Sequence, residues 1–285
     1  MIYNTDHLGY KLYSGQLRDR RKHSEQLNKF VAGFFDSDGS VTVFQDKRYN
    51  RQLRFKSCIT QSHSNDPNGN LLRNLRDFYD IGTVRHRVDD YNQNGVYVWE
   101  MYYKDSRKLF NIIGKHLFIK KIHFQSMLDF FENKQVENLD KLRKESRKVS
   151  ASLTHKKHIS PAYLAGLIAG DGYLKCIIGK ERYRKKEQRY FISNTLKLLI
   201  ELHTDDKPIL DKILSDFGGG LSKRGNKDTW IYQRSLGVGR SDSIKLIKKL
   251  MQYMCLDKKY QTLQEMLEYH QQVAENKHRE SDKDK

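Results

Sequence analysis

Two aspartates occupy matching places in the sequence and could hold a divalent cation. Asp38 lies near the end of FVAGFFDSDG, at residues 30–39. Asp171 has the same place in YLAGLIAGDG, at residues 163–172. An acid at a helix C-terminus adds to the negative pole of the helix, so two such ends side by side call for a cation between them. Carboxylate oxygens favour Mg²⁺ or a similar ion, which beside a nucleic-acid phosphate can promote phosphodiester hydrolysis.

Two helices must bring these acids together. Phe30, Phe34 and their apolar neighbours recur at helical spacing and predict a helix over 25–38. Its counterpart contains Gly166 and Gly170, four residues apart, which leave a flat stripe for another helix backbone. Glycine inside a helix costs up to about 1 kcal/mol relative to alanine. Its use here predicts that the two motif helices pack tightly on each other across a pseudo-twofold axis.

The segments after the two motifs are also alike, so the chain contains an internal repeat. Alternation predicts strands at 40–48, 51–61, 83–89, 96–103, 173–180, 189–202, 220–224 and 229–236. Helical spacing predicts helices at 68–80, 105–117, 120–132, 207–217, 241–254 and 258–274. We therefore expect an α+β fold of two pseudo-symmetric αββαββα halves. Each half would hold a saddle-like antiparallel sheet covered by helices, and the motif helices would join the halves.

The expected organisation has five parts. They are a basic N-terminal extension (1–23), the first half (24–132), a basic linker (133–158), the second half (159–275) and a charged tail (276–285).

The composition indicates a polyanionic partner. Among 285 residues, 53 Lys and Arg face 35 Asp and Glu, so the net charge is 53 − 35 = +18, which favours nucleic acid. A mean hydropathy of −0.82 and apolar runs far shorter than the roughly 20 residues of a bilayer span argue against a membrane protein. The three cysteines are far apart and fit neither a disulfide framework nor a zinc site. Hydrophobic residues make up 37%, which is enough to exclude a disordered chain.

With both motif copies quoted, the sequence resembles the LAGLIDADG homing endonucleases of the single-chain, two-motif type, over about residues 24–275. The resemblance implies that Asp38 and Asp171 are the catalytic metal ligands, with Gly39 and Gly172 as further ligand positions. It implies two or three Mg²⁺ or other divalent cations shared between the two acids. The earlier acid of the motif is Asp36 in the first copy and is replaced in the second, but the family does not need that position for metal binding.

The resemblance also implies the reaction. It predicts a site-specific endonuclease that hydrolyses one phosphodiester on each strand of a long asymmetric duplex site, across the minor groove, and leaves short 3′ overhangs. A polar residue at the end of the second strand would hold the attacking water. Gln61 matches this place, whereas Glu201 and His203 are both open in the second half. Lys120 and Lys258, each with a lysine neighbour, are the candidates for the lysines that stabilise the transition state.

Strand alternation predicts one apolar and one basic face for each sheet. Leu53, Phe55 and Ile59 would point to the core, as would Val84 and Val88 and, in the second half, Leu196, Leu198 and Ile200. The opposite face could read base edges in the major groove, and basic loops such as 180–190 would hold phosphates. The candidate DNA-contacting residues are Ser40, Thr42, Arg48, Gln52, Arg54, Lys56, Thr83, Arg85, Arg87, Tyr173, Lys175, Arg182, Arg184, Lys185, Lys186, Ser193, Thr195, Lys197 and Lys223.

We expect a monomer that is free-standing, intracellular and intron-encoded. The richness in Lys, Asn, Ile and Tyr favours an AT-rich gene, as in a chloroplast or mitochondrion. Two alternatives stay open, a maturase that binds its own intron RNA on the same fold, and a catalytically inactive DNA-binding derivative. The presence of both aspartates argues against the inactive derivative.

Overall fold

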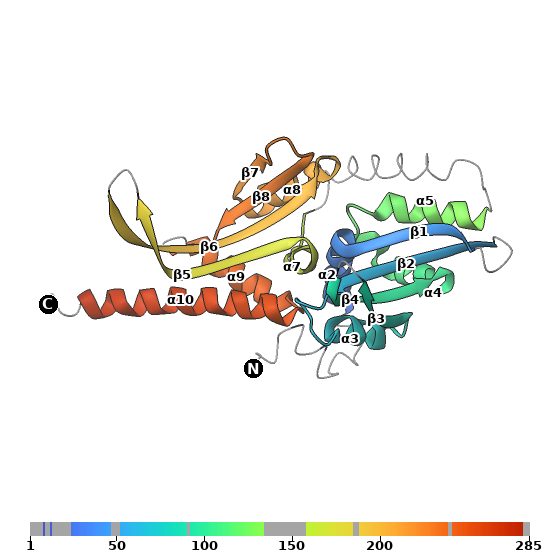
Figure 1. Cartoon of the computed structure of the whole chain (residues 1–285), viewed down its shortest axis with the longest axis horizontal. Coiled ribbons are helices and arrows are strands. Elements are labelled where there is room, and N and C mark those ends of the chain that lie inside the picture. Colours follow the sequence, from blue (N-terminus) through green and yellow to red (C-terminus); the bar gives the residue numbers. More distant parts are fainter. Residues whose placement is uncertain are drawn as a thin grey trace.

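Two halves with the same order of α-helices and strands make up most of the described part of the chain. The computed structural model describes residues 8, 12, 24–46, 52–89, 92–133, 158–184, 188–238 and 241–281. The first half contains α2 (Ser24–Asp38), β1 (Gly39–Asp46), β2 (Gln52–Ser62), α3 (Asn70–Tyr79), β3 (Thr83–Asp89), β4 (Asn92–Tyr102), α4 (Tyr103–Ile113), η2 (Gly114–His116) and α5 (Lys121–Glu132). The second contains α7 (Pro161–Gly170), β5 (Gly172–Arg184), β6 (Arg189–His203), η4 (Thr204–Asp206), α8 (Lys207–Phe217), β7 (Gly220–Lys223), β8 (Thr229–Ser235), α9 (Ser241–Tyr253) and α10 (Asp257–Ser281). The predicted α+β fold is confirmed (Figure 1).

Each half holds a four-stranded antiparallel sheet, in the order β1-β2-β4-β3 or β5-β6-β8-β7. The first strand begins at the glycine that comes directly after the motif aspartate. Gly39 pairs with Ile59, and Gly172 pairs with Ile200 in the same way. The two sheets therefore start from the ends of the motif helices in one common register.

Alternation along the strands builds the core, as the sequence predicts. Phe55, Ile59 and Leu198 are almost completely buried, and Val84 packs against the same core. The prediction for Val88 is wrong, because its side chain is 62% exposed. The pairing of β3 with β4 shifts register between Arg87 and Asp89, so the alternation that brings Val84 to the core does not continue to Val88.

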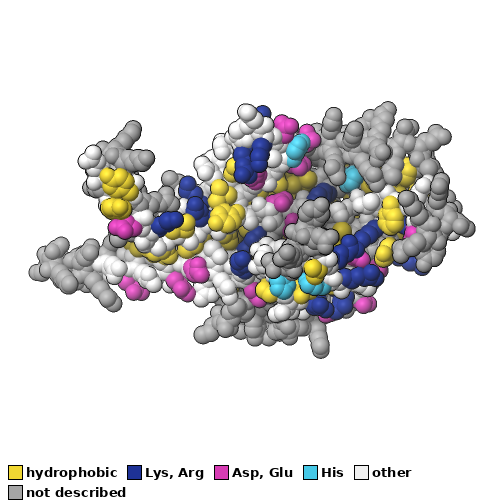
Figure 2. Space-filling model, viewed as in Figure 1, with side chains coloured by type: hydrophobic (Ala, Val, Ile, Leu, Met, Phe, Trp, Pro, Cys, Tyr) yellow, Lys and Arg dark blue, Asp and Glu magenta, His cyan; other side chains and the backbone are white. Residues whose placement is uncertain are grey.

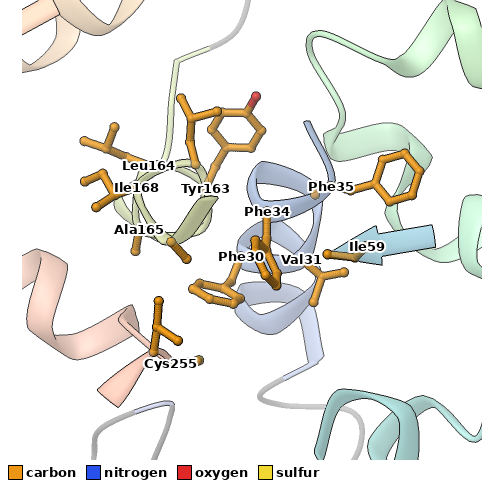
Figure 3. Close-up of a cluster of buried hydrophobic side chains, with 14 of the residues drawn as sticks. Phe30, Val31, Phe34, Phe35, Ile59, Tyr163, Leu164, Ala165, Ile168 and Cys255 are labelled. Carbon is orange, nitrogen blue, oxygen red and sulfur yellow. The ribbon is translucent and has the colours of Figure 1, made fainter. Parts of the chain in front are cut away.

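The two motif helices pack directly on each other, which confirms the predicted junction between the halves (Figure 3). A Cβ atom at Gly33 would lie 2.1 Å from the carbonyl oxygen of Tyr163. A Cβ atom at Gly166 would lie 1.9 Å from the carbonyl oxygen of Phe30. The backbones thus touch at equivalent glycines, where no side chain would fit. Around this contact lies a buried apolar cluster that includes Phe34 and Ile168 (Figure 3).

Some expected parts fall outside the described residues or differ in extent. Most of the extension (1–23) and of the linker (133–158) lies outside, but Leu8 and Leu12 are described and belong to the buried core. α10 continues to Ser281, into the segment predicted as a tail. Among the described residues, no helix is long and apolar enough to cross a bilayer.

The glycine contact makes a direct prediction about stability. Gly166→Ala would place a methyl group against the backbone of α2, so we expect the free energy of unfolding to fall by about 3 kcal/mol. At an open helical position the same substitution would instead stabilise by up to about 1 kcal/mol. Urea denaturation followed by circular dichroism measures the change. Gly220→Ala is the control, because a Cβ atom there meets nothing within 4 Å; equal stability of both variants would contradict the close contact.

Candidate active site

The two motif aspartates lie at the adjoining ends of α2 and α7. Asp38 is the last residue of α2, and Asp171 is the C-cap of α7, directly before β5. A Cβ atom placed on Gly170 would lie 2.9 Å from Asp38 Cγ, so the first carboxylate contacts the end of the second motif helix. The structure therefore brings the two predicted metal-ligating acids together at the junction of the halves.

The surroundings of these acids disfavour their ionised forms. Burial and then the charge of Asp171 raise the pKa of Asp38 to about 7, against the opposing effect of Lys259 and Lys120. Burial also raises the pKa of Asp171, while the same two lysines lower it. Two carboxylates that repel each other at two negative helix poles form a place where a bound cation would be stabilising.

Two lysines neutralise the helix ends. Lys120 Nζ donates to the carbonyl oxygens of Phe35 (3.1 Å), Ser37 (2.7 Å) and Gly39 (2.6 Å) at the end of α2. Lys259 Nζ donates in the same way at the end of α7, to Ile168, Ala169 (2.8 Å), Gly170 (3.2 Å) and Gly172 (2.9 Å). Burial lowers the pKa of Lys259 to about 8, although both aspartates raise it. Each ammonium group thus lies on the negative pole of one motif helix.

The structure brings Lys259, rather than Lys258, to this position. Lys258 is exposed, and its Nζ donates to the carbonyl oxygen of Ser64 at 3.2 Å. The position within the helix does not identify which lysine of the second half corresponds to Lys120. Lys120 precedes α5, whereas Lys259 is the third residue of α10. α10 begins with Asp257, whereas the first turn of α5 contains no acid, so the two helices start differently.

Gln61 reaches across the junction to the opposite motif helix. Its Oε1 accepts from the Ser62 N–H (3.0 Å) and from Asn65 Nδ2 (3.2 Å), which fixes the amide orientation. Its Nε2 donates to the carbonyl oxygen of Ala169 (3.4 Å), which also accepts from Lys259. Gln61 therefore contacts the end of α7, the motif helix of the other half.

Neither predicted counterpart in the second half occupies the position of Gln61. The register that pairs Gly39 with Ile59 and Gly172 with Ile200 places the buried Leu202 at the equivalent position. Glu201 points to the opposite sheet face and accepts hydrogen bonds from Arg224 and from Thr229 Oγ1 (3.1 Å). The sequence does not reveal this, because polar residues flank Leu202 on both sides.

His203 instead lines a pocket at the end of α2. This pocket also contains Lys120, Gly39 and Asp206, an acid that is absent from the residues predicted for the site. Burial raises the pKa of Asp206 to about 6, while the charge of Lys120 lowers it. The two ends of the site are therefore unlike: an amide reaches one motif helix, and an imidazole and a carboxylate lie near the other.

Asp36, the earlier acid of the first motif, is a structural residue. It is buried and accepts from the backbone N–H groups of Phe118 (2.7 Å), Ile119 (3.1 Å) and Lys120 (2.8 Å), and from Tyr163 Oη (2.7 Å). It thereby holds the segment that carries Lys120 and ties it to the second half. Burial raises its pKa, and these four donors oppose that effect.

Most of the predicted DNA-contacting residues lie on the sheet faces opposite the core. The pairing and alternation of the strands place there Ser40, Thr42, Gln52, Arg54, Lys56, Thr83, Arg85, Arg87, Tyr173, Lys175, Ser193, Thr195 and Lys197. We call these two surfaces the open faces. Figure 2 shows Lys and Arg side chains gathered on the first half, at the right of the view. These open faces could therefore meet a polyanion.

The remaining candidates differ. Lys223 pairs with Trp230. Trp230 lies two residues before the buried Tyr232 and so on the core side of the second sheet. Lys223 is therefore not on the open face. Arg48, Lys185 and Lys186 lie outside the described residues, and Arg182 and Arg184 lie in β5 with side chains that the structure does not describe.

The residues at the helix ends suit a hard divalent cation. They offer two carboxylates and the backbone carbonyl groups of Gly39 and Gly172, each of which has a second lone pair beyond its lysine hydrogen bond. In the described part of the chain, no group of three or more His, Cys, Asp and Glu side chains could hold a metal. A cation here would thus depend on the aspartate pair, with oxygens from the backbone, water or a phosphate completing its shell.

Comparisons with known proteins find a family match in the second half and a similar overall fold. Residues 164–270 match the family model described as LAGLIDADG endonuclease. The fold is similar to that of the LAGLIDADG homing endonuclease I-GzeII in complex with its DNA target, with 17% identity, a TM-score of 0.62, and coverage of 88% of this chain and 92% of that one. I-SmaMI bound to cleaved DNA is similar at 19% identity and a TM-score of 0.61, covering 88% and 91%. I-SmaMI bound to uncleaved DNA with calcium ions is similar at 18% identity and 0.61, covering 88% and 92%. No curated protein matches by sequence.

The raised pKa of Asp38 predicts how stability depends on pH. In the unfolded chain this carboxyl titrates near 3.9 but in the folded protein near 7, so its ionisation opposes folding as the pH rises through this range. Without divalent cations, Asp38→Asn should therefore stabilise the protein at pH 8 by about 1–3 kcal/mol, and by much less at pH 4.5. Chemical denaturation at both pH values measures this effect. Asp228→Asn, in an exposed turn, is the control, and a loss of stability in Asp38→Asn at pH 8 would contradict the assignment.

Proposed function

We propose that this chain, whose second half matches the LAGLIDADG endonuclease family and whose two halves share the fold of solved LAGLIDADG homing endonucleases, is a site-specific, metal-dependent DNA endonuclease. The observation that carries the proposal is the aspartate pair at the adjoining helix ends, with Asp38 near pKa 7. The family match covers residues 164–270, and the repeated motif and register extend the same architecture to the first half.

The proposed reaction adds water across one P–O bond in each DNA strand. A divalent cation, Mg²⁺ in the cell, would supply Lewis acidity and lower the pKa of bound water. Asp38 and Asp171 would hold such cations through their carboxylates, each near one scissile phosphate. Lys120 and Lys259 would neutralise charge that develops on the phosphate, because their ammonium groups already lie at the two helix ends. Gln61, with its amide fixed by two hydrogen bonds, would orient water near the α7 end.

The open faces support duplex DNA as the substrate. Arg54, Lys56, Arg85 and Arg87 project from the first sheet, where arginine can pair in a bidentate manner with base edges. One chain carries both halves, so we propose that it acts as a monomer on a long site whose two ends differ in sequence. The unlike side chains near α2 and α7 agree with such asymmetry. We propose that the gene lies in an intron and that cleavage leaves short 3′ overhangs.

Cleavage of duplex DNA tests the proposal. The substrate is the intronless junction of the gene that hosts the coding sequence, or a site recovered from a randomised duplex library. In Mg²⁺, Asp38→Asn and Asp171→Asn should each lower the cleavage rate by a hundredfold or more, on the order of the loss of a transition-state contact, and should retain binding in a gel-shift assay. Lys259→Met should impair cleavage, whereas Lys258→Met, the matched control, should retain it.

Other outcomes would change the assignment. Tight binding of intron RNA without cleavage of any junction would favour the maturase alternative. Specific duplex binding by the wild-type protein without cleavage in any divalent cation would favour an inactive DNA-binding derivative.

A further inference from the structure

A buried carboxylate lies on the open face of the first sheet, where the DNA would bind. Glu100 belongs to β4, and the register places it between Cys58 on β2 and Thr83 on β3. It alternates with Trp99 and Met101, which point to the core. Although Glu100 is on the open side, its side chain is only 1% exposed. Its cover must therefore come from neighbouring side chains on that same face.

Three basic residues surround this carboxylate. Lys56 Nζ lies 2.5 Å from Glu100 Oε1, and Arg87 Nη2 donates to the same oxygen. Arg85 Nε lies 3.8 Å from Oε2. Lys56 comes from β2 and the two arginines come from β3, on opposite sides of β4. Glu100 thus links basic side chains from both neighbouring strands, and all three are candidates for contacting DNA.

This arrangement weakens the electrostatic attraction of the first open face to DNA, so affinity alone does not explain it. A carboxylate on a surface that meets phosphates removes positive charge, so the four side chains together carry 3 − 1 = +2 instead of +3. Yet a buried carboxylate with cationic partners restricts the rotamers of those partners. Lys and Arg side chains otherwise lose conformational entropy when they become ordered on binding, and ordering them in the free protein lowers that cost.

We propose that Glu100 is a positioning residue for sequence specificity, which rests on the proposed function as a DNA endonuclease. It holds Lys56 and Arg87 in fixed directions before DNA arrives, so these two cations reach base edges only in the correct register. It also withholds them from phosphates of unrelated sequences. Specific binding gains from the lower entropy cost of side chains that are already ordered. Non-specific binding has no such gain and is weakened by the positive charge that Glu100 neutralises.

The second sheet offers a weaker arrangement for comparison. Glu201 also lies on an open face, but its carboxylate pairs with one arginine, Arg224. The side chain of Glu201 is 34% exposed, against 1% for Glu100. Of these two described glutamates, only Glu100 has three cations around a buried carboxylate.

Glu100→Gln tests the proposal, since it keeps the shape and removes the charge. The probes are the DNA site that the wild-type protein selects from a randomised duplex library and an unrelated duplex of equal length. We expect the ratio of specific to non-specific affinity to fall about tenfold, and non-specific binding to depend more steeply on salt as the released cations contact phosphates. Glu132→Gln is the matched control, because Glu132 pairs with Arg107 on the helical side of the same half.

A double-mutant cycle separates positioning from a general effect on folding. Arg87→Ala should weaken specific binding several-fold more in the wild-type background than in Glu100→Gln, because only the wild type holds Arg87 in place. An unchanged specificity ratio, or equal losses for both duplexes with no coupling to Arg87, would overturn the proposal. If the wild-type protein selected no site at all, the proposed endonuclease function would fail instead, so the two failures are distinguishable.

Discussion

The close contact between α2 and α7 is the constraint on which the rest of the structure depends. Gly33 and Gly166 let the two backbones touch, and this contact joins the halves. It also places two helix C-termini next to each other, each with an aspartate. Like charges are thereby concentrated at one point, and the pKa of Asp38 rises to about 7 as a result of burial and of Asp171. The packing that stabilises the fold thus creates the electrostatic demand for a cation.

Two lysines of the chain neutralise part of this negative charge. Lys120 and Lys259 each donate several hydrogen bonds to the carbonyl groups that end one motif helix. Asp36 fixes the first lysine through the backbone, and the second motif has Ala169 in its place. The frame is symmetric, but the groups around it are not, since Gln61 has Leu202 as its counterpart by register. A symmetric scaffold with unlike side chains agrees with a monomer that acts on two different DNA strands.

The sequence predicted the features that rest on local periodicity. The doubled motif, the helix junction and the alternation that puts Arg85 on the open face all arise from spacings of two or of three to four residues. The features it could not predict depend on where an element starts or on distant partners. Lys258 and Lys259 are adjacent, and only the start of α10 decides which one faces α7. In the sequence, nothing distinguishes Glu100 from other acids in strands, because its three cationic partners come from β2 and β3.

We propose above all that the two aspartates share divalent cations at the junction of the halves. Crystals of the protein with its cleavable DNA site, grown with Mn²⁺ in place of Mg²⁺, would locate those cations by anomalous scattering. We expect anomalous peaks within coordination distance of the Asp38 and Asp171 carboxylates and of the scissile phosphates. Cleaved DNA in the crystal with Mn²⁺ bound only elsewhere, for example at His203 and Asp206, would contradict it.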